Sequence, residues 1–163
     1  MPAPAGTTSP MVEKGDADVH DVVRDLFAKI PFNQLLGLEI QEMTDEHARL
    51  GFRMRDDLVG NYTRNILHGG VISATLDVTS GLMAFLGVAK RVRTGSLEER
   101  MERFSRLGTI DMRVDYLRPG AGEYFVATAR VIRSGNRIAV IYAELHNEAE
   151  ELIASATCTY LVG

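Results

Sequence analysis

The stretch LHGGVISATLDVTSGLMAFL, residues 67–86, decides the fold. Its apolar residues cover most of the circumference of a helix that we expect to begin near His68 and to end near Leu86. A helix that is apolar on nearly all sides is a buried one, so a sheet must wrap around it. A membrane span is not expected, because Asp77 would place a carboxylate in the middle of the bilayer.

Upstream of this helix, the apolar residues between Val19 and Ile30 recur at helical spacing. We expect Asp16 or Asp18 to cap that helix and Pro31 to end it. The alternating segments 38–43 and 48–54 predict a β-hairpin, followed by a polar loop over residues 56–65.

Downstream, a charged segment over residues 97–107 predicts a surface helix with Ser96 as its cap. The last third of the chain alternates in four segments separated by short turns, which predicts an antiparallel meander. These strands are expected at residues 110–116, 124–133, 138–146 and 152–162. The predicted class is therefore α+β, with an antiparallel sheet of about six strands wrapped around a long central helix.

Length and composition limit the function. The 163 residues suit a single domain, which we place at 19–163, after a Pro/Ala/Gly/Ser-rich tail over 1–18 that we expect to be disordered. A net charge of -4 argues against a nucleic-acid binder, which needs a positive field. Cys158 is the only cysteine, and the four histidines are dispersed, so neither a disulfide nor a metal site is expected. The tail lacks the pattern of a secretion signal, so the expected location is the cytoplasm.

Chemistry is expected at the start of the central helix. The glycines at 69 and 70 let a substrate approach the backbone, and the unpaired N–H groups of a first helical turn can hold an oxyanion. On its own, a His-Gly-Gly sequence more often indicates only that the two glycines relieve crowding at a helix start. However, Asp77 lies nine residues beyond His68 in an apolar segment, where a carboxylate is costly unless it is used. The combination favours an active site.

These segments resemble a known family. Residues 67–77, LHGGVISATLD, resemble the signature of PaaI-type hotdog-fold thioesterases, and residues 109–119, TIDMRVDYLRP, look like the strand that follows the helix in that family. Over residues 19–163, including the ending ASAT at 154–157, the sequence is most similar to the YigI type of bacterial acyl-CoA thioesterase. The resemblance implies hydrolysis of medium- to long-chain acyl-CoA to fatty acid and CoA. It implies no cofactor, since coenzyme A is part of the substrate, and a homodimer or a dimer of dimers.

The resemblance also implies roles for particular residues. Asp77 would act as general base or nucleophile against the helix start of a partner subunit. The N–H of Gly70 would bind the thioester oxygen, His68 would orient that loop, and Thr109 would help to hold the attacking water. The family's asparagine corresponds to Asn61, one position further from His68 than usual, with Asn65 as the alternative.

Other residues are assigned to substrate binding: Leu67, Gly69 and Val71 beside the helix start, and Arg118, Arg133 and Arg137 at strand ends. The arginines are expected to meet the nucleotide of CoA, although each is equally typical of a solvated strand edge. An apolar tunnel for an aliphatic chain is expected along Leu82, Met83 and Phe85 and along Ile66 and Leu67.

Two other functions stay open at this point. A hotdog dehydratase would act on 3-hydroxyacyl thioesters and usually pairs a histidine base with a carboxylate. A non-catalytic acyl-CoA sensor would usually carry a DNA-binding extension, whereas here only one short acidic helix precedes the hairpin.

Overall fold

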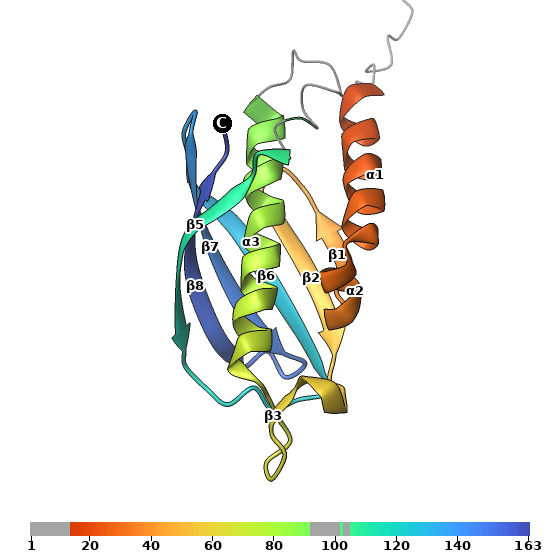
Figure 1. Cartoon of the computed structure of the whole chain (residues 1–163), viewed down its shortest axis with the longest axis vertical. Coiled ribbons are helices and arrows are strands. Elements are labelled where there is room, and N and C mark those ends of the chain that lie inside the picture. Colours follow the sequence, from red (N-terminus) through yellow and green to blue (C-terminus); the bar gives the residue numbers. More distant parts are fainter. Residues whose placement is uncertain (1–13, 92–101, 103–104) are drawn as a thin grey trace, which may run out of the picture.

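A curved antiparallel sheet wraps around one long helix in the computed structural model, which describes residues 14–91, 102 and 105–163 (Figure 1). The helix, α3 (Gly69–Arg91), lies in the hollow of a sheet with the strand order β1-β2-β6-β7-β8-β5. The strands are β1 (Glu39–Met43), β2 (His47–Arg53), β5 (Gly108–Tyr116), β6 (Tyr124–Ser134), β7 (Ile138–Asn147) and β8 (Leu152–Leu161). This is the predicted hotdog architecture.

The core lies between α3 and the concave face of the sheet. Successive inward side chains of β7, at positions 139, 141, 143 and 145, are all 0% exposed, as the twofold alternation of a half-buried strand requires. Leu76 and Met83 of α3 are equally buried against this face. Four inward positions of β6 and β7 are alanines, which lets the helix pack close to the sheet.

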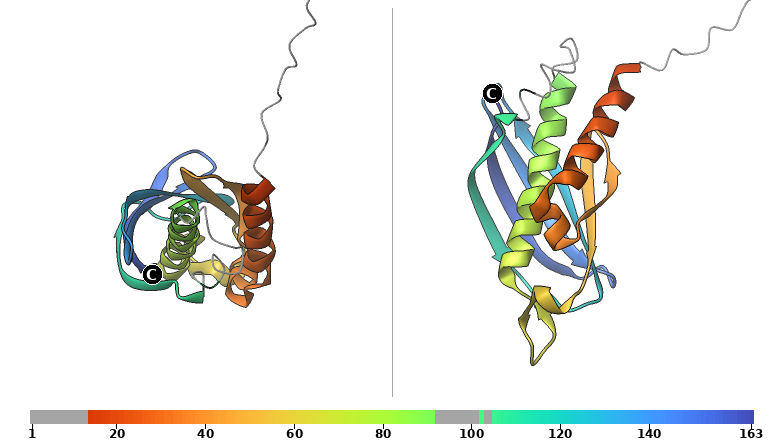
Figure 2. Two further views of the ribbon diagram at one scale, coloured as in Figure 1. Left: turned by 90° about the horizontal axis from the view of Figure 1, so that it is seen from above. Right: turned by 45° about the vertical axis from the view of Figure 1, so that its right-hand side comes forward.

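The remaining open side of α3 faces α1 (Lys14–Lys29) and the short α2 (Pro31–Leu36), as the view from above shows (Figure 2). Helix α1 begins upstream of the predicted start, so Asp16 and Asp18 lie within it and the capping prediction is wrong. The predicted domain boundary at residue 19 likewise falls inside this helix.

Helix α2 is not predicted from the sequence, where Pro31 indicates only the end of the preceding helix. The same proline is a good first residue of the next one, since its missing N–H is not needed there. Gly37 then ends α2 in a left-handed conformation, with φ of 68°.

The predicted four-strand meander is only partly correct. Strands β6, β7 and β8 follow one another as a meander, but β5 pairs with β8 at the far edge of the sheet rather than with β6. The connection after Tyr116 is too long for a tight hairpin and passes beneath the start of α3, where the Leu67 N–H donates to Gly120 O at 2.9 Å. A β-carbon at Gly120 would lie 2.9 Å from that of Leu67, so this crossing needs glycine.

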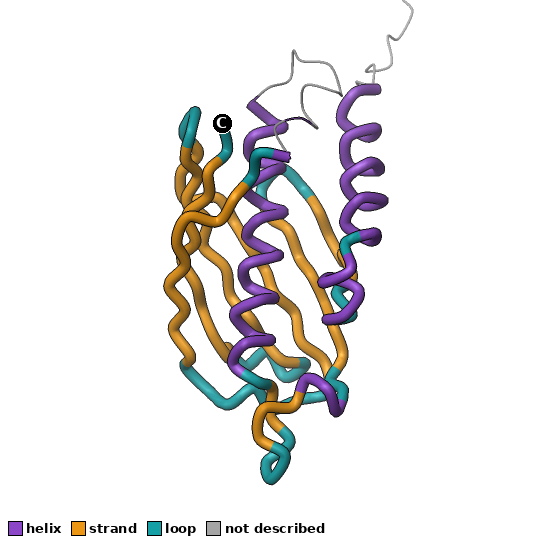
Figure 3. The backbone as a smooth tube through the Cα atoms, in the orientation of Figure 1, coloured by secondary structure: helices purple, strands orange, loops and turns teal. Residues whose placement is uncertain are grey.

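The predicted loop over 56–65 holds some regular structure. A 3₁₀ turn (Asp56–Leu58) leads into a small hairpin of β3 (Val59–Asn61) and β4 (Ile66–Leu67), which projects below the body of the molecule (Figure 3). Most of the predicted surface helix over 97–107 lies outside the described residues. Helix α3 is long and apolar enough to span a membrane, but 72% of its most apolar 18-residue stretch is buried inside the protein, as expected for the core helix of this fold.

Candidate active site

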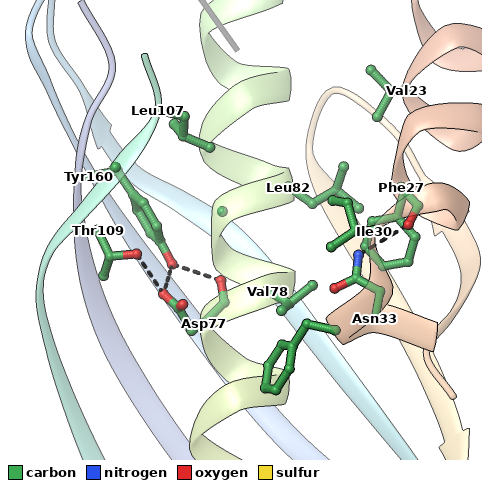
Figure 4. Close-up of a pocket in the computed structure, with 13 residues that line it drawn as sticks. Val23, Phe27, Ile30, Asn33, Asp77, Val78, Leu82, Leu107, Thr109 and Tyr160 are labelled. Atoms are coloured by element: carbon green, nitrogen blue, oxygen red, sulfur yellow. Dashed lines mark hydrogen bonds between the residues drawn. The ribbon is translucent and has the colours of Figure 1, made fainter. Parts of the chain in front are cut away.

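The Asp77 carboxylate sits in the middle of α3, where two hydroxyl groups from the sheet reach it (Figure 4). Thr109 of β5 donates to Asp77 Oδ1 at 3.0 Å, and the hydroxyl of Tyr160, on β8, lies 2.7 Å from the same oxygen. The Tyr160 hydroxyl is also 2.7 Å from the main-chain oxygen of Asp77. No described residue donates to Oδ2, so that oxygen is free to act on a substrate or a water.

The sheet register explains why the two hydroxyls converge. Thr109 and Tyr160 are opposite each other in the β5–β8 ladder, and both point inward. Burial raises the pKa of the Tyr160 hydroxyl far above its ordinary value, and the neighbouring Asp77 charge raises it further. Tyr160 is therefore a permanent hydrogen-bond donor at physiological pH.

At the start of α3, the Gly70 N–H is hydrogen-bonded, whereas the N–H of the preceding Gly69 has no partner among the described residues. The Gly70 N–H, which the resemblance assigned to the thioester oxygen, donates to His68 Nδ1 at 2.8 Å. This hydrogen bond ties the His68 side chain to the helix start and occupies the Gly70 donor. The Gly69 N–H has no acceptor among the described residues, while its carbonyl accepts a hydrogen bond of 3.1 Å from Tyr116. The free donor of the first turn is that of Gly69.

The helix start and the carboxylate are too far apart to act together within one chain. Gly69 and Asp77 lie eight positions apart on α3, which corresponds to about 12 Å along the helix axis. Asp77 lines one cavity, His68 and Gly70 beside Gly69 line a second, and Phe32 lines both.

The cavity beside Asp77 has a volume of about 250 Å³ and lies between α1, α2 and α3. Its apolar walls include Val23, Phe27, Ile30, Phe32, Val78 and Leu82. Of its polar groups, Thr109 and Tyr160 are bonded to Asp77, and the Asn33 amide donates to Phe27 O. The cavity therefore suits a ligand part with few hydrogen-bonding groups.

The tunnel predicted from the sequence is only partly correct. Leu82 lines this cavity, but Met83 and Phe85 are buried at 0% and 2% exposure in the core and do not. Ile66 and Leu67 are not part of it either, and Leu67 packs beside Gly120 instead. Val71 lines the second cavity, together with His68 and Gly70.

The remaining predicted residues are not brought to Asp77 within the chain. Asn61 Oδ1 accepts hydrogen bonds from the N–H and the hydroxyl of Thr63, so it holds the turn of the hairpin. Asn65 occupies that turn with a φ of 48°. Arg118 donates to Leu152 O at one end of the sheet, whereas Arg133 and Arg137 are exposed at the β6–β7 turn at the other end.

Comparison with known proteins agrees with this architecture. Residues 64–154 match the model of the thioesterase superfamily, so the chain belongs to that superfamily. It is 51% identical over 134 residues to the medium/long-chain acyl-CoA thioesterase YigI of Escherichia coli, covering 82% of this chain and 86% of that protein.

Solved structures show the same fold. A crystal structure from Shewanella oneidensis, related to the thioesterase superfamily, has a TM-score of 0.87 and 46% identity and covers 90% of this chain and 97% of its own. A proposed thioesterase from Syntrophus aciditrophicus has a TM-score of 0.83 and 40% identity, with 92% and 99% covered.

Proposed function

We propose that this protein hydrolyses medium- to long-chain acyl-CoA to a fatty acid and CoA. The observation that carries the proposal is a carboxylate at the wall of an apolar cavity, with one oxygen held by two hydroxyls and the other without a donor among the described residues. Asp77 would either take a proton from the attacking water or attack the thioester carbonyl itself. Water and acyl-CoA are the only reactants needed, and no cofactor is invoked. The substrate named for the YigI relative agrees with this cavity.

The oxyanion donor in this proposal is the Gly69 N–H, in place of Gly70. The Gly69 N–H has no acceptor among the described residues and lies at a helix N-terminus. The partial positive charge of the helix there strengthens its interaction with a negatively charged carbonyl oxygen. Because it lies so far from Asp77 of its own chain, we infer that it serves Asp77 of a second copy.

The edge strand β5 supports such a pairing. Among the described strands it pairs only with β8, and it carries exposed Ile110 (55%) and Tyr116 (54%), with exposed Leu117 (50%) directly after its end. An open strand edge with apolar side chains invites a partner strand. We therefore expect a homodimer or a dimer of dimers, and light scattering at micromolar concentration measures it. A monomer with full activity would contradict the shared site.

The cavity predicts a preference among substrates. Octanoyl-CoA and longer acyl-CoAs should give higher kcat/KM than hydroxylated aryl-CoAs, because each buried methylene contributes about 0.8 kcal/mol and the donors of the wall, the Thr109 and Tyr160 hydroxyls and the Asn33 amide, are already bonded. Release of free thiol from a panel of acyl-CoAs measures this. Higher kcat/KM for the aryl-CoAs would refute the aliphatic assignment and leave the thioesterase assignment standing.

The same panel tests the location of the acyl chain. Gly81 lies one turn beyond Asp77 on the cavity wall, and a β-carbon there meets Tyr160 and Leu107 only at 3.6 and 3.9 Å. Gly81→Leu should fold and should lower kcat/KM for long chains by roughly tenfold, since it fills volume that several methylenes would occupy. Butyryl-CoA is the internal control, because a short chain ends before the obstruction. An equal loss on both substrates would place the acyl chain elsewhere.

No observation favours the dehydratase or the sensor. The imidazole of His68 accepts the Gly70 N–H, which leaves it engaged at the helix start rather than poised as a base. Formation of an enoyl product without free thiol would nevertheless identify a dehydratase in the same assay.

A further inference from the structure

We propose that Tyr160 is a positioning residue for Asp77, which together with Thr109 fixes Oδ1 and leaves Oδ2 as the oxygen that reacts. This inference rests on the proposed thioesterase function and deepens it. It assigns a role to a residue near the C-terminus that no motif of the sequence indicates.

The first support is the convergence of two donors on one oxygen. The hydroxyls of Thr109 and Tyr160 lie 3.0 and 2.7 Å from Asp77 Oδ1, and they come from opposite positions of one ladder. Two donors on one oxygen, and none from the described part of the chain on the other, make the two oxygens of the carboxylate inequivalent. Rotation of the carboxylate away from this orientation would break both hydrogen bonds.

The second support is the rigidity of the donor. Tyr160 is 2% exposed and belongs to β8, which is paired on both sides. Its ring lies beside Gly81, one turn along α3 from Asp77. A donor held by the sheet and the central helix fixes the carboxylate more accurately than one on a loop.

A purely structural role for the Tyr160 hydroxyl would not explain its contact with the Asp77 carboxylate. A buried tyrosine hydroxyl needs one partner, and the main-chain oxygen of Asp77, at 2.7 Å, would be enough. The hydroxyl lies equally close to the carboxylate, so it links that side chain to its own backbone and restricts its rotation. Such a link matters for an oxygen that must meet a thioester carbonyl in a defined direction.

Tyr160→Phe tests the proposal, since it removes the hydroxyl and keeps the ring. We expect kcat on a long-chain acyl-CoA to fall roughly 10- to 100-fold, with KM changed by less than about twofold, because the lost interaction orients the reacting group and does not bind the substrate. Thr109→Val should lower kcat in the same way. The double variant should lose less than the product of the two single losses, since both donors act on the same oxygen.

Tyr142→Phe is the matched control. The Tyr142 hydroxyl also donates to a carboxylate, Glu144 Oε1 at 2.9 Å, but on the outer face of the sheet. Its loss should leave kcat and KM unchanged.

Several results would overturn the positioning role. One is a Tyr160→Phe variant whose kcat stays within twofold of wild type. Another is a variant whose KM rises while its kcat is unchanged. A variant that does not fold would show that the hydroxyl serves stability. If the wild-type protein hydrolyses acyl-CoA and Tyr160→Phe does so equally well, only this inference fails. If the wild-type protein releases no thiol from any acyl-CoA, the proposed function itself fails.

Discussion

Asp77→Asn protein should fold and bind acyl-CoA but release almost no thiol. The amide keeps the size of the side chain and can still accept hydrogen bonds from Thr109 and Tyr160 at its oxygen. It can neither take a proton from water nor attack a thioester. The loss of a general base costs about 10²- to 10⁴-fold in kcat, and the loss of a nucleophile more. Single-turnover thiol release measures the chemical step directly.

Two controls make this result specific. Asp111→Asn changes a carboxylate on β5 whose position faces away from the helix, opposite Thr159, and should leave kcat unchanged. Calorimetry with a non-hydrolysable acyl-CoA thioether should give similar affinity for wild type and Asp77→Asn. An Asp77→Asn protein with most of the wild-type turnover would show that the carboxylate is not the catalytic group.

The sequence predicts the parts of this fold that depend on local periodicity. The apolar circumference of 71–86 identifies the buried helix, and alternation identifies the strands to within a few residues. The position of β5 could not be predicted, because it depends on a pairing between residues about fifty positions apart in the chain. Local patterns do not contain the register of such a pair.

The same limit explains what the sequence missed in the site. Asp77 is conspicuous as a carboxylate within an apolar helix. Tyr160 is one inward residue of an alternating strand, and only the β5–β8 register makes it a neighbour of Thr109 and Asp77. Whether Gly69 or Gly70 offers a free N–H depends on the rotamer of His68, which no motif specifies.

Gly69→Pro should reduce kcat by roughly 10²-fold or more, because it removes the N–H that we propose as the oxyanion donor. Proline is well tolerated at the first position of a helix, so the protein should still fold. Gly69→Ala is the matched control: it keeps the N–H, and its β-carbon would meet the Tyr116 ring at an ordinary 3.5 Å. It should retain most of the activity. If Gly70→Pro were inactive and Gly69→Pro active, with both proteins folded, the donor would be Gly70 after all.

Mixing the two inactive variants tests whether each site is shared between subunits. In a dimer of one Asp77→Asn and one Gly69→Pro subunit, one site contains both defects and the other contains neither. Unfolding and refolding an equal mixture should therefore restore about a quarter of the wild-type activity, since half of the subunits enter mixed dimers with one intact site in two. Sites built within a single chain would give no recovery, because every chain in the mixture lacks one of the two groups. Recovery would thus show that Gly69 and Asp77, which lie eight positions apart on α3, act together across two subunits.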